Sequence, residues 1–508
     1  MRKAGPLFAA AMAALVGLTA FAPARAAEPD AATIEWAACA WPREKYECGT
    51  LTVPVDWNNP AGPTVDLFLS RQRATDPAAR IGSLLVNPGG PGLSGATFAT
   101  FDFFSPEVRR RFDIVGFDVR GTAASNRVLC SPDLIAQYPD TFIENQAELD
   151  HWQDFSSRAR ADCKSRTGPV FEHLDSVSVA HDMDALRAAL GEEKVTFYGI
   201  SYGTVIGQAY AERFPRRVRA LVLDSVVDHS IDEGRAFRDT AAFAQDAFDA
   251  FVKWCAGETR CALHGKDVRA IWTRLMDRAE RGELGTHTKR SVARIISSGS
   301  YAPAWWSVAD QIARLDASAP QAQQARPEAQ AQAQAQADGI HLAWQLNCAD
   351  FDTSIRDYRQ YARYVRRAKA VAPDVELNPS HLTLNTWCLS EPKPIPNPQH
   401  RLRVRGAPPI LVVNSRHDPA TGLAWAVSVA RQLGRTGRLL TYEGVGHSVY
   451  DRSDCTISTI DRYLITLKPP AYRASCPAVP LEPPAQARRS HDFLLRDLTD
   501  RPAYETSS

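Results

Sequence analysis

The sequence predicts an α/β protein whose mostly parallel central sheet is interrupted by a long helical insertion. Short apolar runs bounded by Gly, Asp or Pro recur along the chain, as strands that are buried on both faces do. Helical patterns separate the early runs, for example at 179–190, and such alternation is typical of parallel βαβ units. From about residue 230 to 405 the pattern is helical, after which strand-like runs resume. The runs expected as strands are residues 81–86, 113–117, 195–198, 220–223, 409–413 and 439–442.

The length of the chain fits a core that is split by this insertion. Its 508 residues exceed one ordinary domain. We expect a first core segment at 27–229, a helical cap at 230–405 and a second core segment at 406–480, followed by a C-terminal tail at 481–508. A Gln/Ala-rich tract at 321–338 interrupts the cap pattern and is assigned no function.

The N-terminus has the composition of a secretory signal peptide. Arg2 and Lys3 precede an almost wholly apolar stretch at 6–22, and residues 24–26, Ala-Arg-Ala, have the small-x-small form of a cleavage site. A membrane anchor is the alternative, but the apolar stretch is only about 17 residues long and a proline follows it. We therefore expect residues 1–26 to be removed on export to the periplasm or the medium.

The charge of the chain argues against binding to nucleic acid. The 59 Lys and Arg residues nearly balance the 58 Asp and Glu residues, and no run of five or six like charges forms a basic patch. Cleavage of the leader would remove three basic residues and no acidic one, which leaves a net charge of −2. Beyond the leader no stretch of 18 or more apolar residues occurs, so we expect no membrane association of the mature protein.

Ten cysteines suit an exported protein, because an oxidising compartment permits disulfides and an even number leaves none unpaired. Short loops close readily, so pairing of sequence neighbours is the favoured hypothesis among many connectivities. The neighbouring pairs are Cys39 with Cys48, Cys130 with Cys163, Cys255 with Cys261, Cys348 with Cys388, and Cys455 with Cys476. The sequence has no CxxC, no HExxH and no His/Cys cluster at ligand spacing, so we expect no metal and no other cofactor.

The segment Gly-Ile-Ser-Tyr-Gly at 199–203 carries the first chemical signal. It directly follows the strand expected at 195–198, and a helical pattern continues from Thr204. A GxSxG segment between a strand and a helix is a nucleophile elbow, a strained turn that lifts the serine hydroxyl above the sheet edge. We therefore take Ser201 as the candidate nucleophile.

A serine nucleophile needs a histidine base, and the base needs an orienting carboxylate. Asp418 follows the strand expected at 409–413, and His447 lies in a Gly-rich stretch after the strand expected at 439–442. Their order after Ser201 is the chain order Ser, Asp, His of one hydrolase class. Asp224 also follows an expected strand and is the reserve acid, with Asp228 behind it.

The segment Asn-Pro-Gly-Gly-Pro-Gly at 87–92 follows the strand expected at 81–86. Residues without side chains let the backbone approach a substrate oxygen, whereas the alternative is a simple turn. We expect the amides of Gly90 and Tyr202 to form an oxyanion hole.

Together, the segments 87–92 and 199–203 resemble the proline iminopeptidase and tripeptidyl aminopeptidase group of serine peptidases with the α/β-hydrolase fold. Residues 48–57 and 116–122 also match, and the regions at 409–421 and around His447 resemble the C-terminal module of the tripeptidyl aminopeptidase-like branch. The similarity covers roughly residues 35 to 480. A departure is Ala123, where the family usually has Gly.

The resemblance implies an exported serine peptidase that removes Pro, another residue or a tripeptide from the free N-terminus of a peptide. Ser201, His447 and Asp418 would perform acyl transfer, with Gly90 and Tyr202 binding the oxyanion. A carboxylesterase that uses the same triad on small esters is the alternative. A non-catalytic binding protein on this scaffold is disfavoured, because the triad and the elbow glycines are all present.

An aminopeptidase also needs an anion for the ammonium group of its substrate. The stretch Asn-Cys-Ala-Asp at 347–350 resembles a short cap segment of the family, so Asp350 is the first candidate and Asp352 the second. A solvated carboxylate at a helix end is the alternative for both.

Overall fold

The computed structural model describes Met1 and residues 33–483, apart from residues 41–44, 140–142, 323–342, 379–380 and 382–385. Nearly all of the expected signal peptide, most of the Gln/Ala-rich tract and most of the C-terminal tail lie outside the described residues.

The described residues form one sheet of ten strands in the order β1-β2-β3-β5-β4-β6-β7-β8-β9-β10. Strands β4 to β10 pair in parallel, which confirms the predicted fold class, and each of the six expected runs overlaps one of these strands. The strands are β1 (Ala37–Ala38), β2 (Glu47–Pro54), β3 (Thr64–Gln72), β4 (Gly82–Asn87), β5 (Phe112–Phe117), β6 (Val195–Ile200), β7 (Val218–Asp224), β8 (Ile410–His417), β9 (Gly437–Val445) and β10 (Ala474–Cys476).

Strands β2 and β3 form an antiparallel pair, and neither strand is a continuous apolar run in the sequence. Leu51 pairs with Leu67, and β3 continues the sheet by antiparallel pairing with β5. In β3, buried Val65 and Leu67 alternate with exposed Thr64 and Asp66. This alternation is the pattern of a strand with one solvated face, so the signal was present in the sequence with a period of two.

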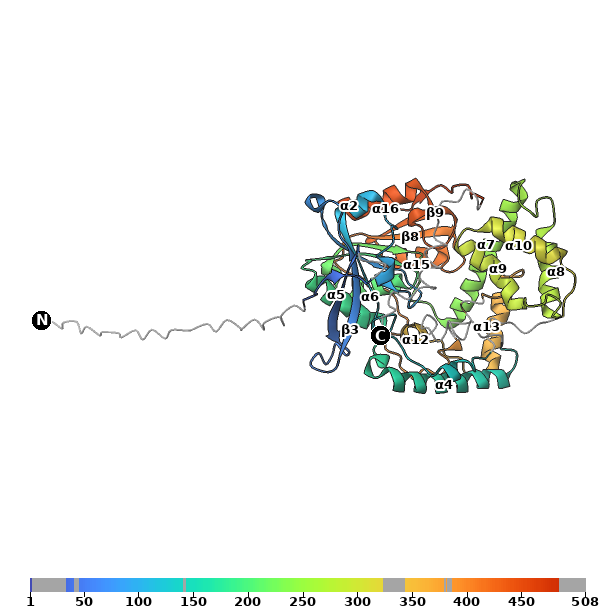
Figure 1. The fold of residues 1–508 in the computed structure, drawn as a ribbon, viewed down its shortest axis with the longest axis horizontal. Coiled ribbons are helices and arrows are strands. Elements are labelled where there is room, and N and C mark those ends of the chain that lie inside the picture. Colours follow the sequence, from blue (N-terminus) through green and yellow to red (C-terminus); the bar gives the residue numbers. More distant parts are fainter. Residues whose placement is uncertain are drawn as a thin grey trace. The chain divides into compact units, whose positions relative to one another are not determined.

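Helices cover both faces of the parallel sheet (Figure 1). Leu84 and Val86 of β4 belong to the cluster that contains residues of α2 and α16, whereas Leu85 belongs to the cluster that contains residues of α5, α6 and α15. The helices that accompany the sheet are α1 (Gly95–Phe98), α2 (Pro106–Arg111), α3 (Pro132–Ile135), α5 (Ser176–Ala189), α6 (Gly203–Arg213), α15 (Leu423–Gln432) and α16 (Asp454–Thr466).

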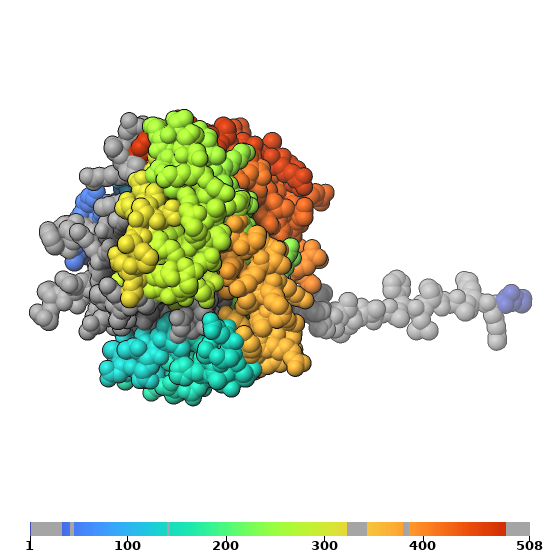
Figure 2. Space-filling view, turned by 90° about the vertical axis from the view of Figure 1, so that its right-hand side faces the viewer, coloured from blue at the N-terminus to red at the C-terminus, as the bar shows by residue number. Residues whose placement is uncertain are grey.

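Between β7 and β8 the regular elements that the structure describes are helices joined by loops, with no strand element among them. Its helices are α7 (Glu233–Gly257), α8 (Val268–Glu280), α9 (Lys289–Tyr301), α10 (Trp305–Ala317), α12 (Trp344–Asp350) and α13 (Tyr358–Val371). Helix α4 (Gln146–Thr167) comes from the first core segment but packs against this region, because Trp152 and Phe155 contact Trp387. Figure 2 shows α4 in cyan below the yellow and green helices of the insertion.

Five disulfides join the same neighbouring cysteines that the spacing favours: Cys39–Cys48, Cys130–Cys163, Cys255–Cys261, Cys348–Cys388 and Cys455–Cys476. Such a set of disulfides is typical of a protein that folds in an oxidising compartment. Among the helices that the structure describes, none combines the length and the apolar character needed to cross a bilayer.

Candidate active site

Ser201 stands at a sharp turn between strand β6 and helix α6. Its backbone φ is +56°, a left-handed conformation that is costly for a residue with a side chain. Flanking glycines make the turn possible. A Cβ atom at Gly199 would lie 2.5 Å from the carbonyl oxygen of Gly203, and one at Gly203 would lie 2.7 Å from Oδ1 of Asn87. The turn therefore presents the Ser201 hydroxyl at the carboxyl edge of the sheet, as a nucleophile elbow does.

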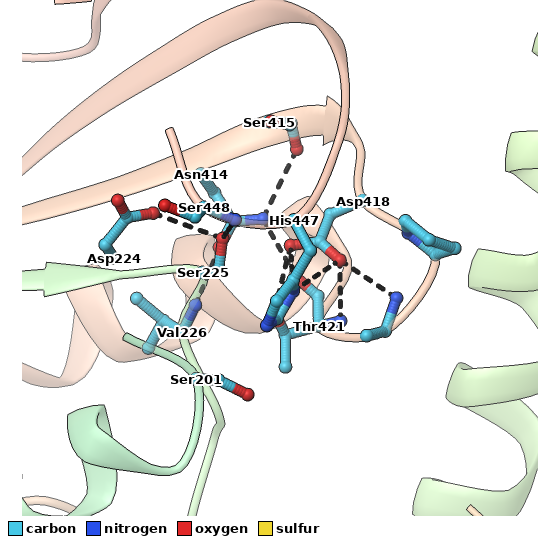
Figure 3. Close-up of polar contacts among 12 residues, drawn as sticks. Ser201, Asp224, Ser225, Val226, Asn414, Ser415, Asp418, Thr421, His447 and Ser448 are labelled. Atoms are coloured by element: carbon cyan, nitrogen blue, oxygen red, sulfur yellow. Dashed lines mark hydrogen bonds and ion pairs between the residues drawn. The ribbon is translucent and has the colours of Figure 1, made fainter. Parts of the chain in front are cut away.

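Asp418 and His447 follow the neighbouring parallel strands β8 and β9. Nδ1 of His447 lies 3.0 and 2.9 Å from the two carboxylate oxygens of Asp418 (Figure 3). The carboxylate also accepts hydrogen bonds from the amides of Ala420 and Thr421, at 2.9 and 3.0 Å, and from the Thr421 hydroxyl at 3.0 Å. Both side chains of the pair are buried, so solvent screens their interaction little.

The other nitrogen of His447 is directed to the nucleophile side of the site. Nε2 is buried and has no hydrogen-bond partner among the described residues. In Figure 3 the imidazole ring lies between the Asp418 carboxylate and Ser201. Catalytic hydrogen bonds are often long in an unliganded site and tighten when substrate binds. The arrangement therefore leaves Nε2 available to the Ser201 hydroxyl.

Tyr301 at the end of α9 covers His447. The two rings stack with their centroids 4.3 Å apart, and the His447 amide donates to the carbonyl oxygen of Tyr301 at 2.9 Å. Burial raises the pKa of the Tyr301 phenol well above its ordinary value, so the phenol stays neutral beside the imidazole. A residue of the insertion therefore helps to hold the base of the candidate triad.

Asp224, the reserve acid, holds the histidine loop without touching the imidazole. Its carboxylate accepts the amide of Val449 at 3.0 and 2.9 Å and a hydrogen bond from the Tyr198 hydroxyl. Burial raises the pKa of Asp224 to about 6. Asp228, the other alternative, accepts hydrogen bonds from Ser230 instead. Of the three candidate acids, the structure brings Asp418 to Nδ1 of His447.

The loop at 87–92 packs against the elbow. A Cβ atom at Gly89 would lie 2.4 Å from the carbonyl oxygen of Ile200 and 3.0 Å from the amide nitrogen of Tyr202. Gly90 has a φ of +111°, a conformation that glycine adopts readily. The amides of Gly90 and Tyr202 donate to no other residue that the structure describes. Two amides of this kind beside a serine are suited to accept a developing oxyanion.

A cavity of about 230 Å³ opens at Ser201. Gly90, Tyr202 and Thr421 contribute its wall on the sheet side. Its apolar lining comes mainly from the start of the insertion and from α15, and includes Val227, Ile231, Ala236, Phe351 and Trp425.

Two carboxylates, Asp228 and Glu233, also line this cavity. Asp228 is only 1% exposed, and its Oδ2 atom has no hydrogen-bond partner among the described residues. Glu233 is buried in the first turn of α7, where Oε1 lies 3.5 Å from Nε2 of His381. The serine hydroxyl thus shares its cavity with two carboxyl groups.

Neither carboxylate expected at the substrate ammonium lies in the cavity wall. Asp350 is completely buried behind it, where it accepts hydrogen bonds from Tyr202, Ser176 and Asn397. Asp352 lies near the surface and pairs with Lys393 at 2.6 Å, which lowers its pKa. The role expected for these two residues is therefore corrected: Asp350 is already saturated with donors, and Asp352 is directed to a lysine outside the cavity.

Sequence patterns missed Glu233 as a cavity residue. Its position three residues before the apolar Ala236 and directly after Asp232 is that of an acidic residue in a helical first turn. Such a pattern identifies the helix but not the direction of the side chain. The sequence offers Asp228 only as a further reserve acid for the histidine, behind Asp224.

Comparisons with known proteins agree with the fold. The family model described as "alpha/beta hydrolase fold" matches residues 82–454. The chain is 33% identical to "Serine protease Hip1" of Mycobacterium tuberculosis over 89% of this chain and 93% of that protein. It is 29% identical to "Tripeptidyl aminopeptidase" of Streptomyces lividans, over 90% of this chain and 88% of that protein. It is 30% identical to "Carboxylesterase B" of Mycobacterium tuberculosis, over 84% of this chain and 86% of that protein.

The family match covers most of the chain, and the similarity to these relatives extends over nearly the whole length of each protein. The relatives include a protease, a peptidase and an esterase. The chain therefore belongs to the α/β-hydrolase family and is a serine hydrolase.

Proposed function

We propose that this protein is an exported exopeptidase that releases Pro, another residue or a tripeptide from the free N-terminus of peptides. Ser201 is the nucleophile, His447 the general base and Asp418 the residue that orients the base, while Gly90 and Tyr202 supply the oxyanion hole. The contact between His447 and Asp418 and the strained turn at Ser201 support these roles. The signal-like leader and the five disulfides support export to the periplasm or the medium.

The reaction follows from the positions of these groups. The Ser201 hydroxyl attacks the scissile carbonyl carbon while its proton passes to Nε2 of His447. The negative charge on the carbonyl oxygen is met by the amides of Gly90 and Tyr202, and Asp418 stabilises the imidazolium that has formed. The imidazolium then gives its proton to the leaving amine. Water, activated by the same imidazole, hydrolyses the acyl-enzyme and releases the N-terminal fragment.

The cavity carboxylates are the observation that favours a peptide with a free N-terminus over a neutral ester. A buried carboxylate oxygen without a partner is costly, and an ammonium group with three N–H donors would satisfy it. Asp228 lines the cavity and has such an oxygen, and Glu233 lies in the same wall. We therefore assign the binding of the substrate ammonium to this pair.

Residues 230–405 are proposed as a cap that restricts the site to chain ends. Residues of this stretch from α7, α9 and α12 line the cavity at Ser201, and Tyr301 packs on His447. A cap over the serine excludes a peptide that continues in both directions, which supports an exopeptidase. Helix α4 contributes to the same region through its contacts with Trp387, although it precedes the elbow in sequence.

Carboxylesterase activity is the second candidate, because the same triad acts on esters and Carboxylesterase B is among the relatives. A panel of substrates separates the two functions. Wild type should hydrolyse unblocked aminoacyl and tripeptidyl p-nitroanilides and should lose activity on their N-acetylated forms. The Ser201→Ala variant should cleave neither and should resist labelling by a fluorophosphonate. Turnover of short p-nitrophenyl esters without any cleavage of unblocked anilides would establish the esterase instead.

The ammonium site has its own test. Asp228→Asn should raise KM for an unblocked anilide by about 10- to 100-fold, because a charged hydrogen bond contributes about 1.5–3 kcal/mol. The same variant should leave KM for a neutral ester nearly unchanged. Asp249→Asn is the matched control, since Asp249 lies on the exposed side of α7 and pairs with Arg269. An equal loss on both substrates would remove Asp228 from the role.

A further inference from the structure

The carboxylate of Asp350 accepts hydrogen bonds from four donor groups beside the elbow. It is fully buried at the end of α12 and accepts from the Ser176 amide at 3.0 and 3.2 Å, and from the Ser176 hydroxyl at 2.9 Å. The Nδ2 atom of Asn397 donates to it at 2.7 Å. The hydroxyl of Tyr202 completes the set of donors. All donors belong to segments that are distant from Asp350 in the sequence.

The donors lie on three different segments, and Asp350 connects these segments to helix α12. Ser176 is the first residue of α5, so its amide lies at a helix N-terminus that favours negative charge. Tyr202 directly follows the candidate nucleophile, and its hydroxyl also lies 3.3 Å from the carbonyl oxygen of Leu346. Asn397 lies near the end of the insertion, on the segment that leads to β8. The carboxylate therefore links α12, α5, the elbow and the returning chain.

Helix α12 also contributes to the substrate cavity. Asn347 lies one helical turn before Asp350 and Phe351 directly follows it, and both line the cavity at Ser201. The Tyr202 side chain thus runs from the elbow to the helix that forms part of the cavity wall, and it is buried along its length.

We propose that Asp350 is a positioning residue for the oxyanion hole, because it anchors the Tyr202 side chain and so orients the backbone amide of Tyr202. The inference rests on the proposed function, in which that amide binds the oxyanion. The cap region then affects the rate of the reaction as well as the entry of substrate. The position of α12 fixes Asp350, and Asp350 in turn fixes the amide of Tyr202 that binds the oxyanion.

The strain of the elbow explains why such an anchor is needed. Ser201 has a positive φ, which persists only where surrounding contacts hold it. On one side, the Ser201 amide donates to the carbonyl oxygen of Asp224 at 2.9 Å, and the Thr204 hydroxyl donates to the carbonyl oxygen of Ser201 at 2.6 Å. The peptide group between Ser201 and Tyr202 carries the oxyanion donor. Its other side is held through the Tyr202 phenol and Asp350.

Two variants test the anchor. Asp350→Asn keeps the shape but brings an amide group to face the donors of Ser176 and Asn397, and Tyr202→Phe removes only the anchored hydroxyl. Both should lower kcat by about 10- to 100-fold, which is less than the loss of a whole oxyanion donor. KM should change by less than about threefold. Because each variant breaks the same contact, the losses should not add in the double variant.

Tyr210→Phe is the matched control. Tyr210 lies on α6, the helix whose N-cap is Tyr202, and its buried hydroxyl donates to Asp184 at 3.1 Å, away from the cavity. This variant should keep the kcat of wild type even if its Tm falls. Rates are expressed per active site titrated with a fluorophosphonate, so a loss of folded protein does not imitate a loss of kcat. If Asp350→Asn does not fold, Tyr202→Phe decides the matter by itself.

Both an unblocked anilide and a small p-nitrophenyl ester serve as substrates, because an oxyanion forms in either reaction. An equal loss of kcat on the two substrates supports the inference, even if the wild type proves to be an esterase. A peptide aldehyde, which forms a tetrahedral adduct, should bind each variant at least tenfold more weakly. Unchanged kcat in Tyr202→Phe, or a loss in Asp350→Asn confined to the unblocked anilide, would overturn the inference.

Discussion

Replacement of Asp418 by Asn tests the choice among the three acids that the sequence left open. In the structure both oxygens of Asp418 lie within 3.0 Å of Nδ1 of His447, and the carboxylate is 1% exposed. An asparagine at this place offers either an amide oxygen without charge or an NH₂ group that favours the wrong tautomer of the imidazole. The variant should therefore fold normally and lose most of its activity.

The expected loss in kcat/KM for Asp418→Asn is about 10⁴-fold, since the orienting acid of such triads has this effect. At 1.36 kcal/mol for each factor of ten, this is about 5.5 kcal/mol of transition-state stabilisation. Asp224→Asn should cost only about tenfold, because Asp224 holds the amide of Val449 two residues beyond the histidine. The test compares the loss in kcat/KM of Asp418→Asn with that of Asp224→Asn.

The assay measures kcat/KM on an unblocked anilide and the rate of fluorophosphonate labelling, with Tm as a check on folding. The labelling rate should fall together with kcat/KM, since both depend on activation of Ser201. The reasoning is refuted if Asp418→Asn retains more than a tenth of wild-type activity, or if Asp224→Asn loses as much as Asp418→Asn.

Three further predictions concern stability. Arg120→Met should lower the free energy of unfolding by about 3–5 kcal/mol in urea denaturation, because it leaves the fully buried carboxyl group of Asp182 without its ion-pair partner. His229→Gln should flatten the acid sensitivity of Tm. Burial lowers the pKa of His229 from 6.5 to about 4, so the unfolded chain takes up the proton first. This site therefore contributes full stability above pH 6.5 and loses about 3 kcal/mol as the pH falls to 4. Removal of the Cys348–Cys388 disulfide by double Ala substitution should cost about 4 kcal/mol by loop entropy, because it closes a 40-residue separation.

Two of these predictions have a matched control variant. Arg158→Met removes an exposed ion pair and should cost less than about 1 kcal/mol, so an equal cost for Arg120 would contradict the argument from burial. Removal of the Cys255–Cys261 disulfide, with a separation of six, should cost only about 2 kcal/mol. For His229, the idea fails if the glutamine variant loses as much Tm as wild type between pH 7 and pH 4.5.

Much of the candidate site could be predicted from the sequence, because the motifs that mark it involve residues close together in the chain. Ser201, Asp418 and His447 each follow an apolar run, and parallel strands deliver the residues after them to one edge of the sheet. The β2–β3 pair was missed for a related reason, since its apolar residues alternate instead of forming a continuous run. Helix α4 was missed as a neighbour of the cap region, because sequence position alone assigned it to the core.

The sequence by itself determined the fold class, the order of the parallel strands along the chain, and the serine, acid and base candidates, because periodicity and strand ends depend on a few neighbouring residues. Only the tertiary structure decided which carboxylates line the cavity at Ser201. Asp350 and Tyr202 are 148 residues apart in the chain, yet the phenol donates directly to the carboxylate. The packing of such distant segments determines where the side chain of a buried acid points. A sequence pattern over a few neighbouring residues cannot predict this.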